Sequence, residues 1–216
     1  MKLYYYDQCP FCVRAIMVAN YKQVAVQKIV LQYDDEATCL RLVQAKQVPI
    51  LEFDDGHAMA ESLDIARKFD EMGTTRRKIL PATELSSSVS NLYCQVASSL
   101  SCLIYPRIVN IALPEFSNQS AINYFQTKKE KVIHRSFTQA LDETAIHVEH
   151  ADAMLRELST NHLPTTDSLT WDDVVIFPQL RNLTVVKGLT FPKSVSDYIK
   201  ERASMTDIKL YFDRAV

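Results

Sequence analysis

Cys9 and Cys12 have the spacing of a redox-active pair, with Pro10 and Phe11 between them. Residues three apart on a helix lie on the same face, which brings two thiols within reach of a disulfide. The thiolate is the nucleophilic form of cysteine, and a helix N-terminus within a Cys-x-x-Cys motif lowers the thiol pKa from about 8.5 to about 3.5–7.5. We therefore expect Cys9 to be an exposed, attacking thiolate and Cys12 to be a more covered thiol that resolves its disulfides.

The flanking sequence predicts the elements that position these thiols. Lys2–Tyr6 has the aromatic and apolar character of a buried parallel strand, and a short polar turn follows it. Apolar residues then recur at helical spacing from residue 11 to about residue 22, and Pro10 suits the first position of that helix. Cys9 is therefore expected at the helix N-terminus, where unpaired N–H groups and the helix dipole stabilise an anion.

A structural zinc site or an incidental pair is the alternative interpretation of Cys9 and Cys12. A zinc site needs further thiolate or imidazole ligands. The other cysteines, Cys39, Cys94 and Cys102, supply no second pair at ligand spacing, and we interpret them as small hydrophobic side chains. The strand before the motif, the proline inside it and the helix after it favour redox chemistry without a metal.

The composition argues against several other classes of function. The chain has 216 residues and a formal net charge of −2, so it lacks the basic excess typical of nucleic-acid-binding proteins. Its glycines, Gly56, Gly73 and Gly188, are too scattered for a phosphate-binding loop. No apolar run reaches the roughly 18 residues of a membrane span, and no signal-peptide pattern is present. An odd number of cysteines in such a chain predicts a reduced, cytoplasmic protein.

The first 72 residues show alternating strand and helix patterns. The order is strand, helix, strand, helix, strand, strand, helix, and the elements after the first helix are expected at residues 26–31, 34–45, 50–53, 58–60 and 63–71. Pro49 belongs at the start of the third strand because proline cannot donate to a sheet ladder. Asp55–Gly56 predicts a hairpin turn, Ser62 a helix N-cap and Gly73 the end of that helix. The crossovers predict parallel pairing at the start of the sheet, and the hairpin adds an antiparallel end.

Residues 73–82 have the character of a linker. They are polar and basic, and a proline lies near their end. We interpret the adjacent cations Arg76–Lys78 as part of a solvated connector rather than as a binding patch. The sequence therefore predicts an α/β domain over residues 1–72 and a second domain over residues 83–216.

The second domain is predicted to be all-helical, because no long alternation of period two follows the linker. Thr83–Tyr105 is expected to form a serine-rich helix that Pro106 ends. Thr170 and Asp173 form a capping box in front of the apolar run Val174–Phe177. That run is apolar all round and predicts a buried helix at the centre of the domain.

Four features together resemble the glutathione-transferase-like fold. They are the Cys-x-x-Cys motif after an apolar strand, Val48–Pro49 before the third strand, Glu61–Ser62 at the third helix and an all-helical second half. The Cys-Pro-Phe-Cys motif further resembles that of the two-domain bacterial glutaredoxins of the glutaredoxin 2 type. The segments Gln47–Leu51 and Arg181–Thr184 strengthen this resemblance, which covers essentially the whole chain. It implies a thioredoxin-like N-terminal domain (βαβαββα) and a glutathione-transferase-like helical C-terminal domain.

The resemblance also implies how glutathione would bind. The peptide bond before Pro49 is expected to be cis, which exposes the backbone of Val48 to pair with the cysteinyl part of glutathione. Glu61 offers an anion for the γ-glutamyl ammonium, while the Ser62 hydroxyl and the helix N–H groups behind it suit the γ-glutamyl carboxylate. The simpler alternative is that Ser62 caps a helix and Glu61 complements its dipole. The predicted glutathione-binding residues are Pro10, Phe11, Val48, Pro49, Glu61 and Ser62.

The expected function is that of a glutathione-dependent thiol–disulfide oxidoreductase, a glutaredoxin. Cys9 would attack protein–glutathione mixed disulfides and protein disulfides, and Cys12 would resolve the intermediates formed with protein disulfides. Glutathione would be the co-substrate, without a metal, and a cytoplasmic monomer would act on glutathionylated or disulfide-bonded proteins, not on nucleic acid or membranes. The alternatives are a cysteine-type glutathione transferase or dehydroascorbate reductase, and a non-enzymatic glutathione-binding adaptor. Phe11 and Cys12 favour disulfide exchange, because transferases activate the thiol of glutathione with a serine, a tyrosine or a lone cysteine.

Overall fold

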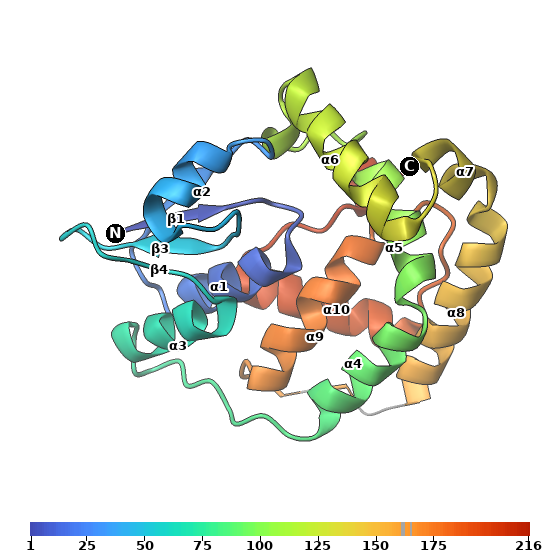
Figure 1. Cartoon of the computed structure of the whole chain (residues 1–216). Coiled ribbons are helices and arrows are strands. Elements are labelled where there is room, and N and C mark those ends of the chain that lie inside the picture. Colours follow the sequence, from blue (N-terminus) through green and yellow to red (C-terminus); the bar gives the residue numbers. More distant parts are fainter. Residues whose placement is uncertain (161–162, 165) are drawn as a thin grey trace. The chain divides into compact units, whose positions relative to one another are not determined.

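The structure is a computed structural model that describes residues 1–160, 163–164 and 166–216. The contacts between residues divide the chain, drawn in Figure 1, into two units. The first unit contains Met1–Lys78 and Ala112–Phe125, and the second contains Ile79–Ile111 and Gln126–Val216. A segment from the middle of the chain therefore belongs to the N-terminal unit.

The first unit is built on a small mixed sheet with helices on both faces. Its strands pair in the order β2–β1–β3–β4. In Figure 1, α1 and α3 lie on one face of the sheet and α2 lies on the other. The elements are β1 Lys2–Tyr5, α1 Pro10–Tyr21, β2 Gln27–Val30, α2 Glu36–Val43, β3 Ile50–Glu52, β4 Ala58–Met59 and α3 Ser62–Met72. The predicted order of strands and helices is confirmed.

The third strand runs in a direction that the sequence analysis did not expect. β1 and β2 pair in parallel, as predicted, but β3 is antiparallel to β1, with Leu3 opposite Leu51. A crossover gives a parallel strand only when it carries the chain back along the whole sheet. After α2, Glu36–Val43, the chain turns at Gln44, where φ is 57°, and β3 starts at the end of the sheet where β2 finishes.

Two glycines are required by the local backbone. The β3–β4 turn closes with hydrogen bonds from the N–H of Phe53 to the carbonyl of His57 at 2.8 Å and from the N–H of Gly56 to the carbonyl of Phe53 at 3.0 Å. Gly56 has a φ of 87°, which residues with a Cβ rarely adopt. Gly73 ends α3, and a Cβ at this position would lie 2.4 Å from the Cβ of Lys22. The predicted hairpin turn and helix end are both confirmed.

Residues 112–125 complete the first unit. They contain η1, a 3-10 turn at Pro114–Phe116, and the start of α6, Gln119–Ile133. The rings of Tyr33 and Phe125 meet edge to face, with their centroids 4.8 Å apart. The backbone N–H of Tyr33 donates to the carbonyl of Glu115 at 3.0 Å. This segment therefore brings Glu115 next to Tyr33, which lies far from it in the sequence.

The second unit is built from helices. They are α4 Leu85–Gln95, α5 Ala97–Ile108, the rest of α6, α7 Phe137–Asp142, α8 Thr144–Thr160, α9 Trp171–Leu183 and α10 Lys193–Thr206, followed by the 3-10 turn η2 Phe212–Arg214. The single helix expected over residues 83–105 is wrong, because α4 and α5 meet at Val96, where φ is −116° and ψ is 12°. Pro106 lies inside α5 rather than after it. Proline removes one helical hydrogen bond, and α5 continues past Pro106 only to Ile108.

α9 forms the buried centre of the second unit, as predicted. Val174, Ile176 and Phe177 have no exposed surface. The Oγ1 of Thr170 accepts the N–H of Asp173 at 3.0 Å, and the Oδ2 of Asp173 accepts the N–H of Thr170 at 2.8 Å. These reciprocal hydrogen bonds confirm the predicted capping box.

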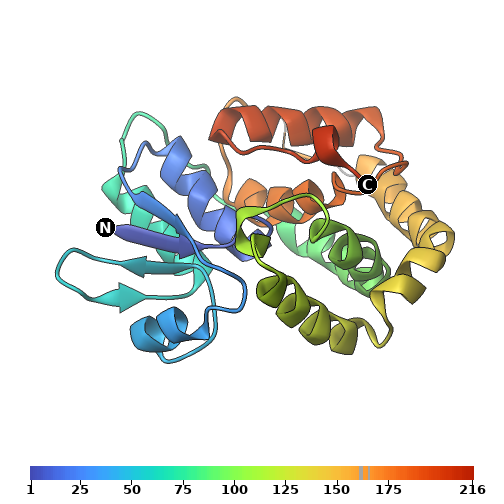
Figure 2. The same ribbon diagram turned by 90° about the horizontal axis from the view of Figure 1, so that it is seen from above.

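A buried ion pair joins α10 to the start of α9. The Nε of Arg202 lies 3.0 Å from the Oδ1 of Asp173, and neither side chain is exposed. The hydroxyl of Tyr198 donates to the same oxygen at 2.9 Å. Figure 2 shows α10, in red, beside α9, in orange. The Asp173 carboxylate thus serves both the helix cap and the packing of two helices.

The predicted linker, residues 73–82, is divided between the two units. Near its start, the N–H of Thr74 donates to the carbonyl of Lys22 at 2.9 Å in the first unit. Near its end, Leu80 forms an isolated bridge with Thr170 in the second unit. The predicted domain limits at residues 72 and 83 stay a prediction.

Candidate active site

Cys9 lies at the N-cap of α1. Its backbone is extended, with φ of −75° and ψ of 115°, and Pro10 takes the first position of the helix. The Sγ of Cys9 accepts the N–H of Cys12 at 3.4 Å, and its carbonyl accepts the N–H of Val13 at 3.0 Å. The predicted placement of the Cys9 sulfur at the N–H end of a helix is confirmed.

The two thiols differ in how readily they ionise. A hydrogen bond from the Cys12 thiol lowers the pKa of Cys9, and the N–H groups of Cys12 and Phe11 add to this effect, which outweighs burial and the charge of Glu115. Burial raises the pKa of Cys12 well above its ordinary value, and its hydrogen bond to Cys9 raises it further. The Cys9 thiol therefore ionises more readily than the Cys12 thiol, which is the direction of asymmetry that the sequence predicted.

The exposure of Cys9 differs from the sequence expectation. Cys9 is buried, with 9% of its surface exposed, and Cys12 has no exposed surface. The prediction of an exposed Cys9 is therefore wrong. Cys9 is nevertheless the more accessible of the two cysteines, as expected. Neither forms a disulfide. Both belong to an apolar cluster of the sheet whose other buried members are Tyr4, Tyr6, Leu31, Cys39 and Ile50. The motif by itself does not predict this burial, because the other members of the cluster lie elsewhere in the sequence.

Val48 and Pro49 are brought to the same apolar cluster. The peptide bond between them is cis, as the resemblance implied. Val48 is half-buried and packs against the cluster that contains Cys9. No hydrogen bond joins the backbone of Val48 to any part of the chain that the structure describes. The backbone of Val48 is therefore available to a ligand that lies along the cluster.

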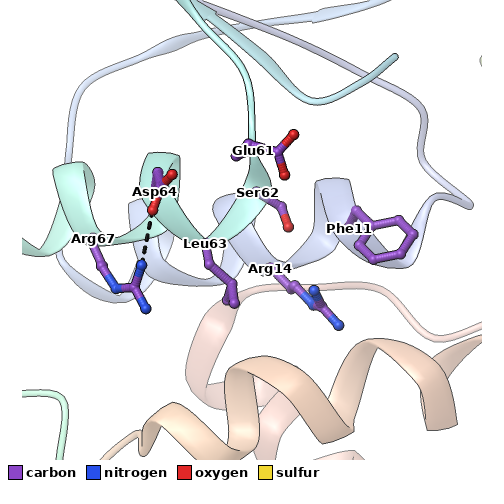
Figure 3. Close-up of a pocket in the computed structure, with 7 residues that line it drawn as sticks. All are labelled: Phe11, Arg14, Glu61, Ser62, Leu63, Asp64 and Arg67. Carbon is purple, nitrogen blue, oxygen red and sulfur yellow. Dashed lines mark hydrogen bonds and ion pairs between the residues drawn. The ribbon is translucent and has the colours of Figure 1, made fainter.

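A pocket of about 280 Å³ lies beside the motif, between α1 and the start of α3. Figure 3 shows Phe11 and Arg14 projecting from α1 and Glu61 and Ser62 at the start of α3. Phe11 is 51% exposed, and the guanidinium of Arg14 lies 4.8 Å from the centre of its ring. The pocket is lined by Phe11, Arg14, Glu61, Ser62, Leu63, Asp64 and Arg67. It therefore offers both positive and negative charges and the aromatic ring of Phe11, which belongs to the Cys9–Cys12 motif.

The start of α3 forms part of the lining of this pocket. Glu61, not Ser62, is the N-cap residue, so the prediction of Ser62 as the N-cap is wrong. Glu61 has a φ of 68°, in the left-handed region, which turns the chain one residue earlier and makes the buried Ser62 the first helical residue. The Glu61 side chain forms no capping hydrogen bond, and the N–H groups of the first helical turn, at the pocket-lining residues Ser62–Asp64, have no intrahelical partner.

The sequence analysis missed two charged residues near the thiols. Arg14 lies one turn after Phe11 on α1, a spacing that could have identified it as a neighbour of the motif. Burial lowers the pKa of Arg14, and the negative charge of Cys9 opposes this shift. Glu115 is fully buried, and its Oε1 accepts the N–H of Gln8 at 2.9 Å. No sequence signal marks Glu115, because 107 positions separate it from Gln8.

Metal-binding clusters and membrane-spanning helices are absent from the residues that the structure describes. Among them, no group of three or more His, Cys, Asp or Glu side chains is arranged to hold a metal ion. Within the same residues, no helix has both the length and the apolar character needed to cross a bilayer.

Comparison with known proteins identifies the family. Residues 88–215 match the family model of the glutaredoxin 2 C-terminal domain, and residues 3–74 match that of the glutathione S-transferase N-terminal domain. Glutaredoxin 2 of Escherichia coli strain K12 is 34% identical to this chain over the full length of both. The chain belongs to the glutaredoxin 2 family.

Solved structures agree with this assignment. Glutaredoxin 2 from Salmonella typhimurium, solved in complex with glutathione, is 36% identical, covers 100% of this chain and 98% of its own, and superposes with a TM-score of 0.88. A glutathione S-transferase of Ceriporiopsis subvermispora, also in complex with glutathione, covers 97% of both chains with a TM-score of 0.69 and 14% identity. The second similarity shows a shared fold alone.

The family settles the general activity of this glutaredoxin. Glutaredoxins are glutathione-dependent oxidoreductases, so the predicted activity and the predicted use of glutathione as co-substrate are confirmed. The predicted fold class, a thioredoxin-like unit followed by a glutathione-transferase-like helical unit, is confirmed as well.

Proposed function

We propose that this glutaredoxin reduces protein–glutathione mixed disulfides through Cys9. The Cys9 thiolate attacks the glutathione sulfur, a Cys9–glutathione disulfide forms, and the protein thiolate leaves. A second glutathione thiolate then attacks this disulfide, releasing glutathione disulfide and restoring the Cys9 thiolate. The observation that carries the proposal is the Sγ of Cys9 at the N-cap of α1, where hydrogen bonds from Cys12 favour the ionised form.

With protein disulfides, we propose that Cys12 completes the reaction. Cys9 first forms a mixed disulfide with one substrate sulfur. The Cys12 thiol then attacks the Cys9 sulfur, the Cys9–Cys12 disulfide forms, and the proton of Cys12 passes to the departing substrate thiolate. The raised pKa of Cys12 supports this division of roles, because Cys12 keeps its proton until the mixed disulfide has formed.

We further propose that glutathione occupies the pocket between α1 and α3. Glu61 pairs with the γ-glutamyl ammonium, and the Ser62 hydroxyl with the N–H groups of α3 binds the γ-glutamyl carboxylate. The free backbone of Val48 pairs with the cysteinyl unit, which places the glutathione sulfur toward Cys9. The proposal is supported by the related Salmonella protein, which was solved in complex with glutathione. The remaining predicted contacts are Pro10, Phe11 and Pro49.

Arg14 adds a positive charge to this pocket. It lies over the ring of Phe11, and its Nε is buried with no hydrogen-bond partner among the described residues. A planar guanidinium is suited to a carboxylate, and glutathione carries two carboxylates. We propose that Arg14 binds the tripeptide at one of them.

The proposed partners are glutathionylated and disulfide-bonded proteins, which a monomer of this chain would meet in the cytoplasm. The support for this location is chemical, because the cycle above needs a pool of reduced glutathione.

Mass spectrometry tests the proposed site directly. The Cys12→Ser protein is mixed with a glutathionylated peptide, trapped with acid and digested. We expect one bound glutathione, carried by Cys9. A glutathione adduct on Cys39, Cys94 or Cys102 instead, or no adduct at all, would contradict the proposal.

A further inference from the structure

Glu115 is a buried carboxyl group that the mechanism above does not use. It lies in η1 and has no exposed surface. Glutamate is almost never fully buried unless it is paired. Its Oε1 accepts the N–H of Gln8 at 2.9 Å, and Gln8 directly precedes Cys9. The side chain therefore reaches the turn that leads into the active-site motif.

The second carboxyl oxygen of Glu115, Oε2, is buried. Among the residues that the structure describes, no group donates a hydrogen bond to it and no Lys, Arg or His side chain forms an ion pair with it. Burial raises the pKa of Glu115 to about 7, against the opposing effect of the Gln8 N–H. A buried, partly satisfied carboxyl group in a native protein calls for an explanation.

Three acidic groups interact electrostatically with Glu115, namely Asp7, Cys9 and Cys12. Asp7 adds to the upward shift of its pKa, and the charge of Glu115 raises the pKa of both Cys9 and Cys12. Tyr6, beside the thiols, stays neutral because burial raises its pKa. Arg14, which lines the proposed glutathione pocket, is a cation that interacts with the charge of Cys9.

Two negative charges in this buried site repel each other. Water does not screen them, so ionisation of Cys9 and ionisation of Glu115 compete. When Cys9 is a thiolate, Glu115 favours the acid form. When Cys9 is bound in a disulfide and carries no charge, Glu115 is free to ionise.

We propose that Glu115 is a positioning residue that holds a proton while the Cys9–Cys12 pair is reduced and releases that proton when the disulfide forms. The reduction then balances as follows. The Cys9–Cys12 disulfide, the Glu115 carboxylate and two glutathione thiols yield the Cys9 thiolate, the Cys12 thiol, the Glu115 carboxylic acid and glutathione disulfide. Both protons and both electrons come from glutathione, and the buried site carries one negative charge before and after the reaction.

If Glu115 had a purely structural role, the redox potential of the cysteine pair would depend on pH in the same way with and without its carboxyl proton. In that case Glu115 only anchors the turn before Cys9 through the N–H of Gln8. The Glu115→Gln side chain keeps a carbonyl oxygen that can accept this N–H, so the turn is retained while the exchangeable proton is lost. The variant therefore separates anchoring from proton binding.

The experiment is a redox titration of the full-length protein against glutathione buffers at several pH values around 7. For a two-electron couple, one bound proton changes the potential by about 29.6 mV per pH unit, because one pH unit is a tenfold change in proton concentration. We expect the redox potential of the wild type to change with pH more steeply than that of Glu115→Gln, by this amount per pH unit. Glu52→Gln, which removes a carboxylate of β3 that accepts the hydroxyl of Tyr4, is the matched control and should keep the wild-type slope.

The outcomes separate this inference from the proposed function on which it rests. If the redox potential depends equally on pH in wild type and Glu115→Gln, while glutathione still reduces the Cys9–Cys12 disulfide, the role of Glu115 is overturned and the proposed function is not. A Cys9–Cys12 pair that glutathione does not reduce in any variant would overturn both. If Glu115→Gln does not fold, the redox-difference infrared spectrum of the wild type decides, since reduction must produce a carboxylic-acid C=O band. Absence of that band would overturn the inference.

Discussion

The backbone N–H of Cys12 donates a hydrogen bond to the Sγ of Cys9 at 3.4 Å. The thiol of Cys12 also donates to this sulfur, and it makes the largest contribution to the lowered pKa of Cys9. The residue proposed to resolve the disulfide therefore also stabilises the attacking thiolate. Because one side chain has both roles, its removal is expected to affect the two activities of the enzyme differently.

The two cysteine variants should separate these activities. Cys9→Ser is expected to reduce both deglutathionylation and protein-disulfide reduction to the background rate, because the nucleophile is absent. Cys12→Ser should keep most of the deglutathionylation activity and lose dithiol reduction. The measurement is coupled NADPH oxidation with a glutathionylated peptide and with a protein disulfide as substrates. Equal loss in both variants with the glutathionylated peptide would contradict the assigned roles.

The pH dependence of alkylation should report the lowered pKa of Cys9. Since the thiolate is the reacting form, we expect the alkylation rate of Cys9 to reach half its maximum below the ordinary cysteine pKa of about 8.5. Cys12→Ala should raise this midpoint by roughly 1–2 pH units, because a hydrogen bond to a charged group is worth about 1.5–3 kcal/mol. Cys12→Ser keeps a donor and should shift it less. The rate is followed by peptide mapping, with the unfolded protein as control, and equal midpoints in folded and unfolded protein would refute the prediction.

Glu61 is expected to contribute to glutathione binding rather than to bond breaking. Its side chain is exposed, so loss of its charge in Glu61→Gln should raise KM for a glutathionylated peptide by about two- to fivefold, in the range of an exposed ion pair. kcat should change little. Glu71→Gln, on the same helix but outside the pocket, is the matched control and should behave as wild type. A fall in kcat with unchanged KM would exclude the proposed ammonium contact.

The buried pair of Asp173 and Arg202 should dominate the stability of the second unit. Asp173→Asn leaves Arg202 buried without a counter-charge, which costs about 3–5 kcal/mol. Asp197→Asn removes an exposed carboxylate paired with Lys193 on α10 and should cost less than about 1 kcal/mol. Urea unfolding followed by circular dichroism measures both. Similar midpoints for the two variants would show that the buried pair is not needed.

Local chemistry made part of this molecule predictable from the sequence. The N-cap position of Cys9 follows from a strand, a proline and helical spacing within about a dozen residues. The capping box of Thr170 and Asp173 and the turn at Gly56 are equally local, because each depends on backbone groups within four residues. The cis bond before Pro49 was expected only through the resemblance to a known family.

Only the tertiary structure decided which distant residues surround the active site. The direction of β3 depends on where α2 ends relative to the sheet, and the motif does not encode this. The burial of Cys9 depends on side chains from several strands, and the contact of Glu115 with Gln8 joins residues 107 positions apart. A sequence pattern reports neighbours along the chain, whereas the charge and exposure of a buried thiol are determined by neighbours in space.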